Sequence, residues 1–330
     1  MSLPEGSPGG ATVLAVDSGG SGLRVAVSPL AAAGPGPAQV RHRHTPVPTG
    51  PRGIDAEHLL AGVRELTAGL AEPLRPVAVC VGAAGMATLG EELRERLPSA
   101  LAAEFGVRRV ALAADAVTAY AGALGQQPGA VVAAGTGLIA MGTDLSPAGG
   151  WRRADGWGHL LGDCGGGAWI GRAGLEAALR EHDGRQGGSG ALLERLTARF
   201  GAPAALPALL YPRTDRPALL ASFAPDVAAC AAGDPVAADI LERAAAEIAD
   251  AMAAVCPDVP GARIAVTGGL LRLGAPLTEP LHAALDKRLP RARETGAVGD
   301  PLHGALVVAA ALAAGNLRLP VDGRLLHVPG

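Results

Sequence analysis

The sequence predicts an α/β protein made of two similar halves. A strand, a glycine turn and a second strand occupy residues 12–28, and the same pattern returns at residues 130–142. After each hairpin the chain alternates between helical apolar spacing and short apolar runs that are typical of strands. This alternation indicates sheets covered by helices, and its return indicates an internal repeat. A length of 330 residues suits two domains.

In the first half, two apolar runs flank the turn Asp17–Gly22 and predict a β-hairpin. Residues 29–55 are rich in proline, so we expect irregular backbone there. The elements that follow are helices expected at residues 56–72, about 89–104 and from just after Asp115, and strands expected at 77–81 and 109–113.

The second half begins with the hairpin 130–142. Residues 155–171 are too rich in glycine for a strand or a helix, so we expect an ordered loop that leads into a helix. Residues 202–217 are again proline-rich and predict a connection. The remaining elements are a strand expected at 264–267, helices expected at 167–180, 189–200, 276–288 and 301–314, and a longer helical region expected at 224–254.

Charge and apolar content exclude several classes of function. The net charge is −3 and 18% of the residues are charged, which gives no electrostatic footprint for nucleic acid or anionic lipid. The longest apolar runs, such as 305–314, reach about half a membrane span. Residues 1–11 are rich in glycine and proline and show no signal peptide. We therefore expect a cytoplasmic protein with neither nucleic acid nor a membrane as partner.

The two glycine turns are candidate phosphate-binding sites. Their backbone N–H groups can approach a phosphate because glycine has no Cβ in the way. The residues concerned are Ser18, Gly19, Gly20 and Ser21 in the first turn and Gly135, Thr136 and Gly137 in the second. Asp17 ends the first strand and can hold Mg²⁺, directly or through water. Each turn alone also fits an ordinary hairpin, but two of them together can clamp a triphosphate.

Lysine usage excludes the main competing classes of phosphate-binding protein. A P-loop requires a lysine directly after its glycine loop, and a protein kinase requires a lysine on a strand. Lys287 is the only lysine, and it lies within a predicted helix. The glycine turns also join strand to strand, whereas a dinucleotide-binding fingerprint joins strand to helix.

Asp115 is the candidate catalytic residue. It follows an apolar strand and opens a helix, where the helix dipole favours an ionised carboxylate. A carboxylate in this position can accept the proton of a substrate hydroxyl during phosphoryl transfer. The alternative is a simple helix N-cap.

The glycine-rich loop carries the candidate substrate residues Gly156, Trp157, His159 and Asp163. The indole of Trp157 presents a flat apolar face, and the imidazole of His159 presents a polar end. The carboxylate of Asp163 can accept hydrogen bonds from paired hydroxyls. Packing is the alternative for Trp157 and His159. Gly268-Gly269 follows another strand. Because these two residues have no side chains, their backbone can lie against a planar base or a phosphate.

In this order the motifs resemble the sugar kinase, actin and heat-shock ATPase superfamily. They look closest to the BadF/BadG/BcrA/BcrD-type ATPases, the group that contains N-acetylglucosamine kinase. The resemblance covers roughly residues 12–314, and Gly156–Asp163 resembles the signature of the kinase subgroup. It implies two actin-like (ribonuclease H-like) ATPase domains around a central cleft. The first would be 12–118 plus about 301–330, and the second 119–300.

The resemblance also implies a reaction. ATP and Mg²⁺ would be the cofactors, with Asp17 near the metal, adenosine on Gly268-Gly269 and Asp115 as the catalytic aspartate. The substrate would be a sugar or amino sugar, such as N-acetylglucosamine, glucosamine or a related hexose, and a homodimer is left open. Two alternatives remain: an ATPase that activates an electron-transfer dehydratase, and a non-catalytic sugar-binding regulator.

Sequence features weigh against both alternatives. An iron–sulfur cluster at a dimer interface needs cysteines close together, and the spacing of Cys80, Cys164, Cys230 and Cys256 does not suggest this. These four are expected to be reduced thiols. A regulator normally needs a DNA-binding module, for which residues 1–11 leave no room.

Two departures from the family concern the substrate. Cys164-Gly165-Gly166 stands where the family usually has Glu-Gly-Ser, so a negative charge and a hydroxyl are missing. N-acetylglucosamine kinases also place an asparagine on the sugar from the loop after the first hairpin, whereas Asn316 is the only asparagine of this chain. Thr49 or Arg52 would have to replace it. Neither departure affects the residues for phosphoryl transfer.

Overall fold

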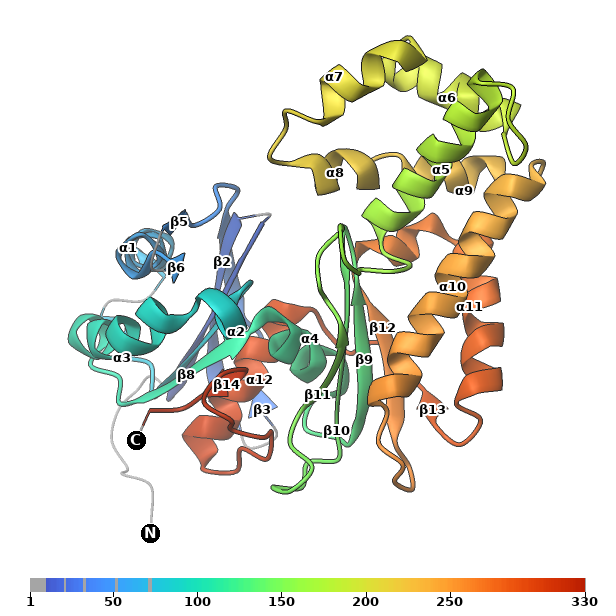
Figure 1. Cartoon of the computed structure of the whole chain (residues 1–330). Coiled ribbons are helices and arrows are strands. Elements are labelled where there is room, and N and C mark those ends of the chain that lie inside the picture. The colour runs from blue at the N-terminus through green and yellow to red at the C-terminus, as the bar shows by residue number, and fades with distance from the viewer. Residues whose placement is uncertain (1–9, 21, 32–33, 51–52, 71–72, 330) are drawn as a thin grey trace. The chain divides into compact units, whose positions relative to one another are not determined.

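The computed structural model describes residues 10–20, 22–31, 34–50, 53–70 and 73–329 (Figure 1). The chain divides into two compact units. Unit 1 comprises Met1–Gln127, Leu145–Gly150 and Ala297–Gly330, and unit 2 comprises Pro128–Asp144 and Trp151–Gly296. Among the described residues, we find no helix with the length and apolar character that a membrane span requires.

Unit 1 is built on a mixed sheet. The hairpin of β1 (Thr12–Gly19) and β2 (Gly22–Ala31) is antiparallel, and β7 (Ala78–Ala83) and β8 (Arg109–Ala114) continue from β1 in parallel. Every residue of β7 is buried, as expected for a parallel strand covered on both faces. Three further strands complete the sheet: β14 (Leu326–His327) beside β8, and β3 (Gly34–Pro35) and β4 (Gln39–Arg43) beside β2.

Helices cover both faces of this sheet. Leu23 points toward α1 (Ala56–Thr67), where a Cβ on Gly62 would lie 2.6 Å from its side chain. Its neighbour Arg24 points the other way and contacts Asp300, which caps α12 (Pro301–Ala314). The helices α2 (Met86–Leu89), α3 (Glu91–Phe105) and α4 (Asp115–Leu124) complete the described helices of this unit.

Unit 2 repeats the arrangement of strands. β9 (Gly129–Ala134) and β10 (Leu138–Thr143) form an antiparallel hairpin, and β12 (Arg263–Thr267) runs parallel to β9. The order is β11-β10-β9-β12-β13, where β11 is Arg152–Asp155 and β13 is Arg293–Glu294. Each unit thus pairs a hairpin with parallel strands, which confirms the two similar α/β halves that the sequence predicts.

Helices supply most of the core of unit 2. They are α5 (Gly167–His182), α6 (Gly190–Phe200), α7 (Leu206–Leu210), α8 (Arg216–Ala221), α9 (Ala224–Cys230), α10 (Pro235–Val255) and α11 (Ala275–Arg288), with short 3₁₀ turns at Pro203–Ala205 and Gly269–Leu273. The apolar stripe of α10, including Ile240, Ile248 and Met252, is fully buried. It packs on α11, α5 and β10 in the core that also contains Phe223.

Two predictions about local structure were wrong, and one strand was missed. Residues 29–55 are not irregular throughout, because they include β4 and the small hairpin of β5 (Thr49–Gly50) and β6 (Gly53–Ile54). β4 pairs only with β2 and has no fully buried residue, so it lacks the apolar alternation that identifies strands. The connection 202–217 contains α7 and part of α8, and the strand β11 was missed.

The region predicted to be helical at 224–254 is helical, but it is not one continuous helix. It breaks into α9 and α10, because the Asp234 carboxylate accepts the N–H groups of Val236 (2.8 Å) and Ala237 (3.0 Å) and starts a new helix.

The two backbones of α4 and α12 touch in unit 1. A Cβ on Gly304 of α12 would lie 1.8 Å from the carbonyl oxygen of Thr118 in α4. A Cβ on Gly122 of α4 would lie 2.2 Å from the carbonyl oxygen of Asp300. Because α4 begins at Asp115, this contact fixes the helix that carries the candidate catalytic carboxylate.

We expect Gly304→Ala to destabilise the protein. Alanine favours a helix over glycine by about 1 kcal/mol, but the clash with Thr118 forces the helices apart. Overpacking of this kind costs about 1–3 kcal/mol or more, so urea unfolding should show a net loss. Gly190→Ala is the matched control, since a Cβ there meets nothing within 4 Å. A Gly304→Ala protein as stable as Gly190→Ala would contradict the close crossing.

Candidate functional site

The first glycine turn ends a strand of unit 1. Asp17, Ser18 and Gly19 are the last residues of β1, and the register pairs Gly19 with Gly22. Ser18 is buried, with 5% of its surface exposed, whereas Gly20 at the tip is exposed. Ser21, also predicted to bind phosphate, lies outside the described residues. The described backbone of this turn is therefore half-buried at Gly19 and exposed at Gly20.

Asp17 is held by an arginine that the sequence analysis missed. Arg24 is its cross-strand partner, and Arg24 Nη2 lies 2.6 Å and Nε 3.0 Å from Asp17 Oδ2. The same guanidinium reaches Asp300 Oδ2 through Nη1 at 2.5 Å. Arg24 thus joins the end of β1 to the start of α12. The register of a two-residue hairpin was the signal that could have identified the pair.

Burial controls the charge of this cluster. The side chain of Asp17 is only 15% exposed, and burial raises the pKa of its carboxyl while the Arg24 guanidinium opposes that rise. Burial acts in the same direction on Asp300, but the N–H of His303 and the Arg24 guanidinium hold the pKa of that carboxyl below its ordinary value. Arg24 therefore favours the ionised form of both carboxylates.

The acidic side chains of unit 1 are consistent with a metal that arrives with a nucleotide. In the part of the chain that the structure describes, no three His, Cys, Asp or Glu side chains form a metal cage. Mg²⁺ commonly uses one or two carboxylates together with water and substrate phosphates. Asp17 can supply such a carboxylate, since Arg24 contacts its Oδ2.

Asp115 is the first residue of α4 and is exposed. Ala114 occupies the N-cap position, so the Asp115 carboxylate lies in the first turn of the helix. Its Oδ1 accepts the N–H of Ala116 at 2.9 Å. This hydrogen bond satisfies an N–H group of the first turn, so support of the helix start remains an alternative role. An accessible carboxylate stabilised by the helix N-terminus is also what a proton acceptor needs.

The second glycine turn is docked on a helix of unit 2. Gly135 donates its N–H to the carbonyl of Gly137 at 2.9 Å and so closes the turn. The first N–H groups of α5, from Gly167 and Ala168, donate to the carbonyls of Gly135 (2.9 Å) and Thr136 (2.8 Å). Thr136 at the tip is exposed. The helix N-terminus therefore supports this turn through direct hydrogen bonds.

Asp163 lies directly against this turn. A Cβ on Gly137 would be 2.3 Å from Asp163 Oδ2, so only glycine permits the contact. Asp163 Oδ1 accepts the N–H of Gly158 at 3.1 Å. Burial raises the pKa of the Asp163 carboxyl, whereas the N–H groups of Gly158 and Leu138 act to lower it. The structure thus brings a predicted substrate residue and a predicted phosphate turn together.

Trp157 stands out from the loop. It is 67% exposed, which argues against the packing alternative. The guanidinium of Arg153 lies 4.7 Å from the centroid of its ring and also donates from Nη2 to the carbonyl of Gly156 at 2.6 Å. His159 is half-buried. Arg153, another residue that sequence reasoning missed, therefore braces one face of the indole.

Gly268 meets the same end of the unit 2 sheet. It has φ +109°, and a Cβ there would lie 2.2 Å from the carbonyl oxygen of Ala134, the residue before the second turn. Gly269 opens the 3₁₀ turn Gly269–Leu273, which was not predicted between the double glycine and α11. Unit 2 thus gathers the second turn, Asp163 and Gly268-Gly269.

The structure adds little about the remaining predicted positions. Arg52 lies outside the described residues, as do residues 1–9 of the Gly/Pro-rich start. Thr49 forms β5 with Gly50. All four cysteines are free thiols, and Cys164 is half-buried beside Asp163 in sequence.

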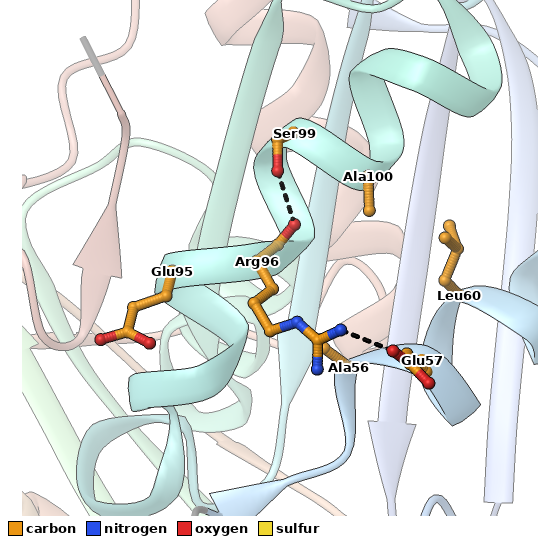
Figure 2. Close-up of a pocket in the computed structure, with 7 residues that line it drawn as sticks. All are labelled: Ala56, Glu57, Leu60, Glu95, Arg96, Ser99 and Ala100. Carbon is orange, nitrogen blue, oxygen red and sulfur yellow. Dashed lines mark hydrogen bonds and ion pairs between the residues drawn. The ribbon is translucent and has the colours of Figure 1, made fainter.

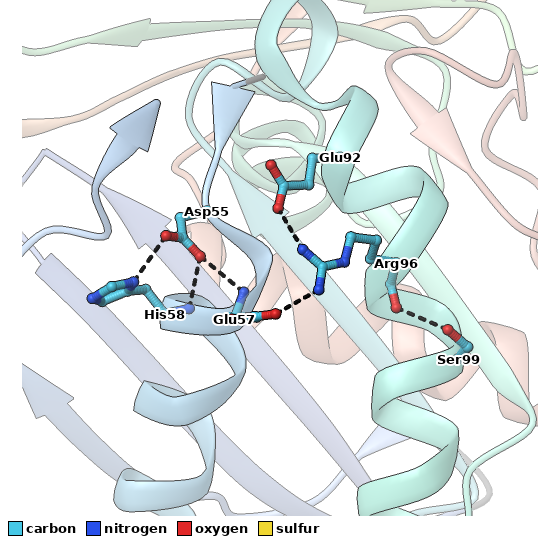
Figure 3. A network of polar contacts seen from close by, with 6 residues as sticks. All are labelled: Asp55, Glu57, His58, Glu92, Arg96 and Ser99. Carbon is cyan, nitrogen blue, oxygen red and sulfur yellow. Dashed lines mark hydrogen bonds and ion pairs between the residues drawn. The ribbon is translucent and has the colours of Figure 1, made fainter. Parts of the chain in front are cut away.

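Two surface pockets contain none of the predicted site residues. One, of about 320 Å³, lies between α1 and α3 of unit 1 (Figure 2). Its Arg96 contacts Glu57 and Glu92, and Asp55 contacts His58 and caps α1 (Figure 3). The other, of about 380 Å³, is lined by residues of 256–262 and 288–292 in unit 2. The ion pair between Arg96 and Glu57 joins α3 to α1.

Comparison with known proteins places these features in a family. The profile of the BadF/BadG/BcrA/BcrD ATPase family matches residues 16–309. An N-acetylmuramic acid/N-acetylglucosamine kinase from Clostridium acetobutylicum is 34% identical over 109 residues, which cover 33% of this chain and 34% of that protein. The match therefore spans about a third of that curated relative.

Solved structures share the fold. A candidate N-acetylglucosamine kinase from Chromobacterium violaceum superposes with a TM-score of 0.66 and 27% identity, covering 93% of this chain and 100% of that one. A ROK family glucokinase from Streptomyces griseus, in complex with glucose and AMPPNP, gives a TM-score of 0.51 at 19% identity, covering 92% and 100%. The fold is therefore the mixed α/β, actin-like fold of the ROK and hexokinase proteins.

We expect Arg24→Met to destabilise unit 1. It leaves the buried Asp17 carboxylate without its ion-pair partner, and the cost should be about 1–3 kcal/mol because Arg24 is partly exposed. Denaturant unfolding measures the loss. Arg213→Met is the control, since it removes an exposed pair with Asp215 and should change little. Equal stability of the two variants would show that Arg24 does not hold Asp17.

Proposed function

The chain belongs to the BadF/BadG/BcrA/BcrD ATPase family, and on this premise we propose that it is an ATP-dependent sugar kinase. One observation carries the proposal: Asp163, a candidate ligand for sugar hydroxyls, lies against the glycine turn at Gly137. A kinase must hold the acceptor hydroxyl close to the phosphate that it receives. The name of the Clostridium acetobutylicum relative supports an amino sugar as substrate.

Unit 1 supplies the residues for proton transfer and for the metal. Asp115 accepts the proton of the attacking hydroxyl, because its carboxylate is exposed at the start of α4. Asp17 holds Mg²⁺, with Arg24 keeping its carboxylate oriented. When bound, the metal neutralises charge on the phosphates. The turn at Gly19 and Gly20 contributes N–H groups toward phosphate oxygens.

Unit 2 supplies the second phosphate turn and the substrate residues. The N–H groups of Thr136 and Gly137 donate to phosphate, since that of Gly135 closes the turn, and Gly268-Gly269 offers backbone without side chains for adenosine. Gly156, Trp157, His159 and Asp163 contact the sugar, the indole through its free face and the carboxylate through charge-assisted hydrogen bonds.

The reaction follows from these roles. The sugar oxygen forms a bond to the γ-phosphorus while the bond from that phosphorus to the bridging oxygen of ADP breaks. The hydroxyl proton passes to Asp115, and ADP leaves with the bonding electron pair. The protein contributes mainly positioning and stabilisation of charge.

A substrate panel tests the proposal. N-acetylglucosamine, N-acetylmuramic acid, glucosamine and glucose would each be supplied with Mg·ATP, and ADP release measured against a reaction without sugar. We expect at least one sugar to accelerate ADP release strongly. Because Cys164 stands where the family has an acidic residue, we also expect tolerance at the acetamido position, so glucosamine or glucose should be accepted. No acceleration by any sugar, together with iron and sulfide in the purified protein, would favour the dehydratase activator.

We expect Asp115→Asn to lower kcat by about 10²- to 10⁴-fold while the KM for ATP changes little, because the shape is kept and the proton acceptor is lost. Steady-state kinetics with the best sugar of the panel measures both. Glu91→Gln is the matched control, since Glu91 also lies in the first turn of a helix of unit 1. Near-normal turnover in Asp115→Asn would remove this residue from the mechanism.

We expect Asp163→Ala to raise the KM for the sugar by about 10- to 100-fold, since a hydrogen bond to a charged group contributes about 1.5–3 kcal/mol. Slow hydrolysis of ATP without sugar should persist. Asp183→Ala, an exposed aspartate at the other end of α5, is the control. If the KM for ATP rises and the KM for the sugar does not, Asp163 serves the phosphate turn alone.

A further inference from the structure

Asp155 closes the base of the loop that carries the candidate substrate residues. It is the last residue of β11. Its Oδ1 accepts the N–H of Asp163 at 2.6 Å, and its Oδ2 accepts the N–H of Cys164 at 2.8 Å. Both carboxylate oxygens are therefore used on consecutive N–H groups, and they close a loop whose ends, Asp155 and Asp163, are eight positions apart in the sequence. Charge-assisted bonds of this kind are stronger than bonds between neutral groups.

Two residues of this loop have an unfavourable backbone conformation. Asp155 and Asp163 have φ of +58° and +57°, in the left-handed region that residues with a Cβ seldom occupy. Such conformations persist where surrounding interactions hold them. A Cβ on Gly162 would lie 2.4 Å from Asp155 Oδ1, so the chain just before Asp163 packs directly on this carboxylate.

The carboxylate of Asp163 forms further contacts that hold the loop closed. Asp163 Oδ1 accepts the N–H of Gly158, and its Oδ2 lies against Gly137 of the phosphate turn. The orientation of the Asp163 carboxylate is thus set by the backbone at 163, which is in turn set by Asp155. Trp157 lies within the closed loop and remains exposed.

From this geometry we infer that Asp155 is a positioning residue of the sugar site, which orients Asp163 through the N–H groups of Asp163 and Cys164. The inference rests on the proposed function, because Asp163 is there the ligand of the sugar. Because both oxygens of Asp155 accept backbone N–H groups, Asp155 is assigned no contact with substrate or phosphate. Its removal should therefore act through Asp163 and affect the sugar more than ATP.

A double-mutant cycle tests the coupling. We expect Asp155→Ala to raise the KM for the sugar by about 10-fold or more, the range seen when outer partners of a ligand are lost. The KM for ATP should change much less than the KM for the sugar, because Asp155 contacts the backbone of Asp163 and Cys164. Added to Asp163→Ala, the substitution should have almost no further effect, because residues that act as one unit are not additive. Asp155→Asn keeps one acceptor and should lie between wild type and Asp155→Ala.

Hydrogen exchange gives a readout that does not depend on activity. In the free full-length protein, the amides of Asp163 and Cys164 should exchange slowly, and Asp155→Ala should expose them to exchange. If the wild type phosphorylates no sugar of the panel, the proposed function fails, and this measurement still decides whether Asp155 fixes the backbone of Asp163.

A control separates positioning from stability. Asp322 of unit 1 accepts the N–H groups of Arg324, Leu325 and Leu326, so Asp322→Ala removes a comparable turn-closing carboxylate. It should lower the melting temperature without changing the KM for the sugar. The inference is overturned by an unchanged sugar KM in Asp155→Ala, by effects of Asp155→Ala and Asp163→Ala that multiply, or by unchanged amide exchange. If Asp155→Ala does not fold, Asp155→Asn carries the same comparisons.

Discussion

Both units depend on backbone segments that come closer together than a Cβ permits. In unit 1, α12 meets α4 with Gly304 against the carbonyl of Thr118. In unit 2, Gly137 meets the carboxylate of Asp163, and Gly167 meets the carbonyl of Gly135. These contacts leave no room for adjustment, because interiors are close-packed. The helix that begins at Asp115 and the loop that ends at Asp163 are therefore fixed by steric contact as well as by hydrogen bonds.

Each candidate carboxylate of the proposed reaction has a donor from its own unit. Arg24 holds Asp17, the N–H of Ala116 contacts Asp115, and the N–H of Gly158 contacts Asp163. An oriented carboxylate loses less freedom when it binds a metal or a hydroxyl than one that must first be ordered. Arg24 and Asp155 were not among the predicted site residues. They matter to the proposed mechanism because they orient Asp17 and Asp163 before a ligand binds.

The sequence predicted what local patterns encode. Apolar runs beside glycine turns identified both hairpins, and the final helix was predicted at 301–314, where α12 lies. β4 was not predicted, because an edge strand with exposed side chains has no apolar alternation. The break at Asp234 carried a readable signal, an N-cap aspartate followed by proline, that the long apolar pattern obscured. Arg24 could be identified only by working out the register of the first hairpin, which pairs it with Asp17. Asp155 could not be identified from the sequence, because its partners depend on loop geometry.

The order of the elements along the chain has a consequence for synthesis. Unit 1 uses residues on both sides of unit 2, and α12 is the helix that packs on β1, β7 and α4. A ribosome makes α12 only after it has made unit 2, so folding of unit 2 can begin while unit 1 still lacks a helix. During that interval the apolar residues of β1 and α4 that α12 covers have no partner within the nascent chain. Unit 1 therefore reaches its final packing last, although its first strand is made first.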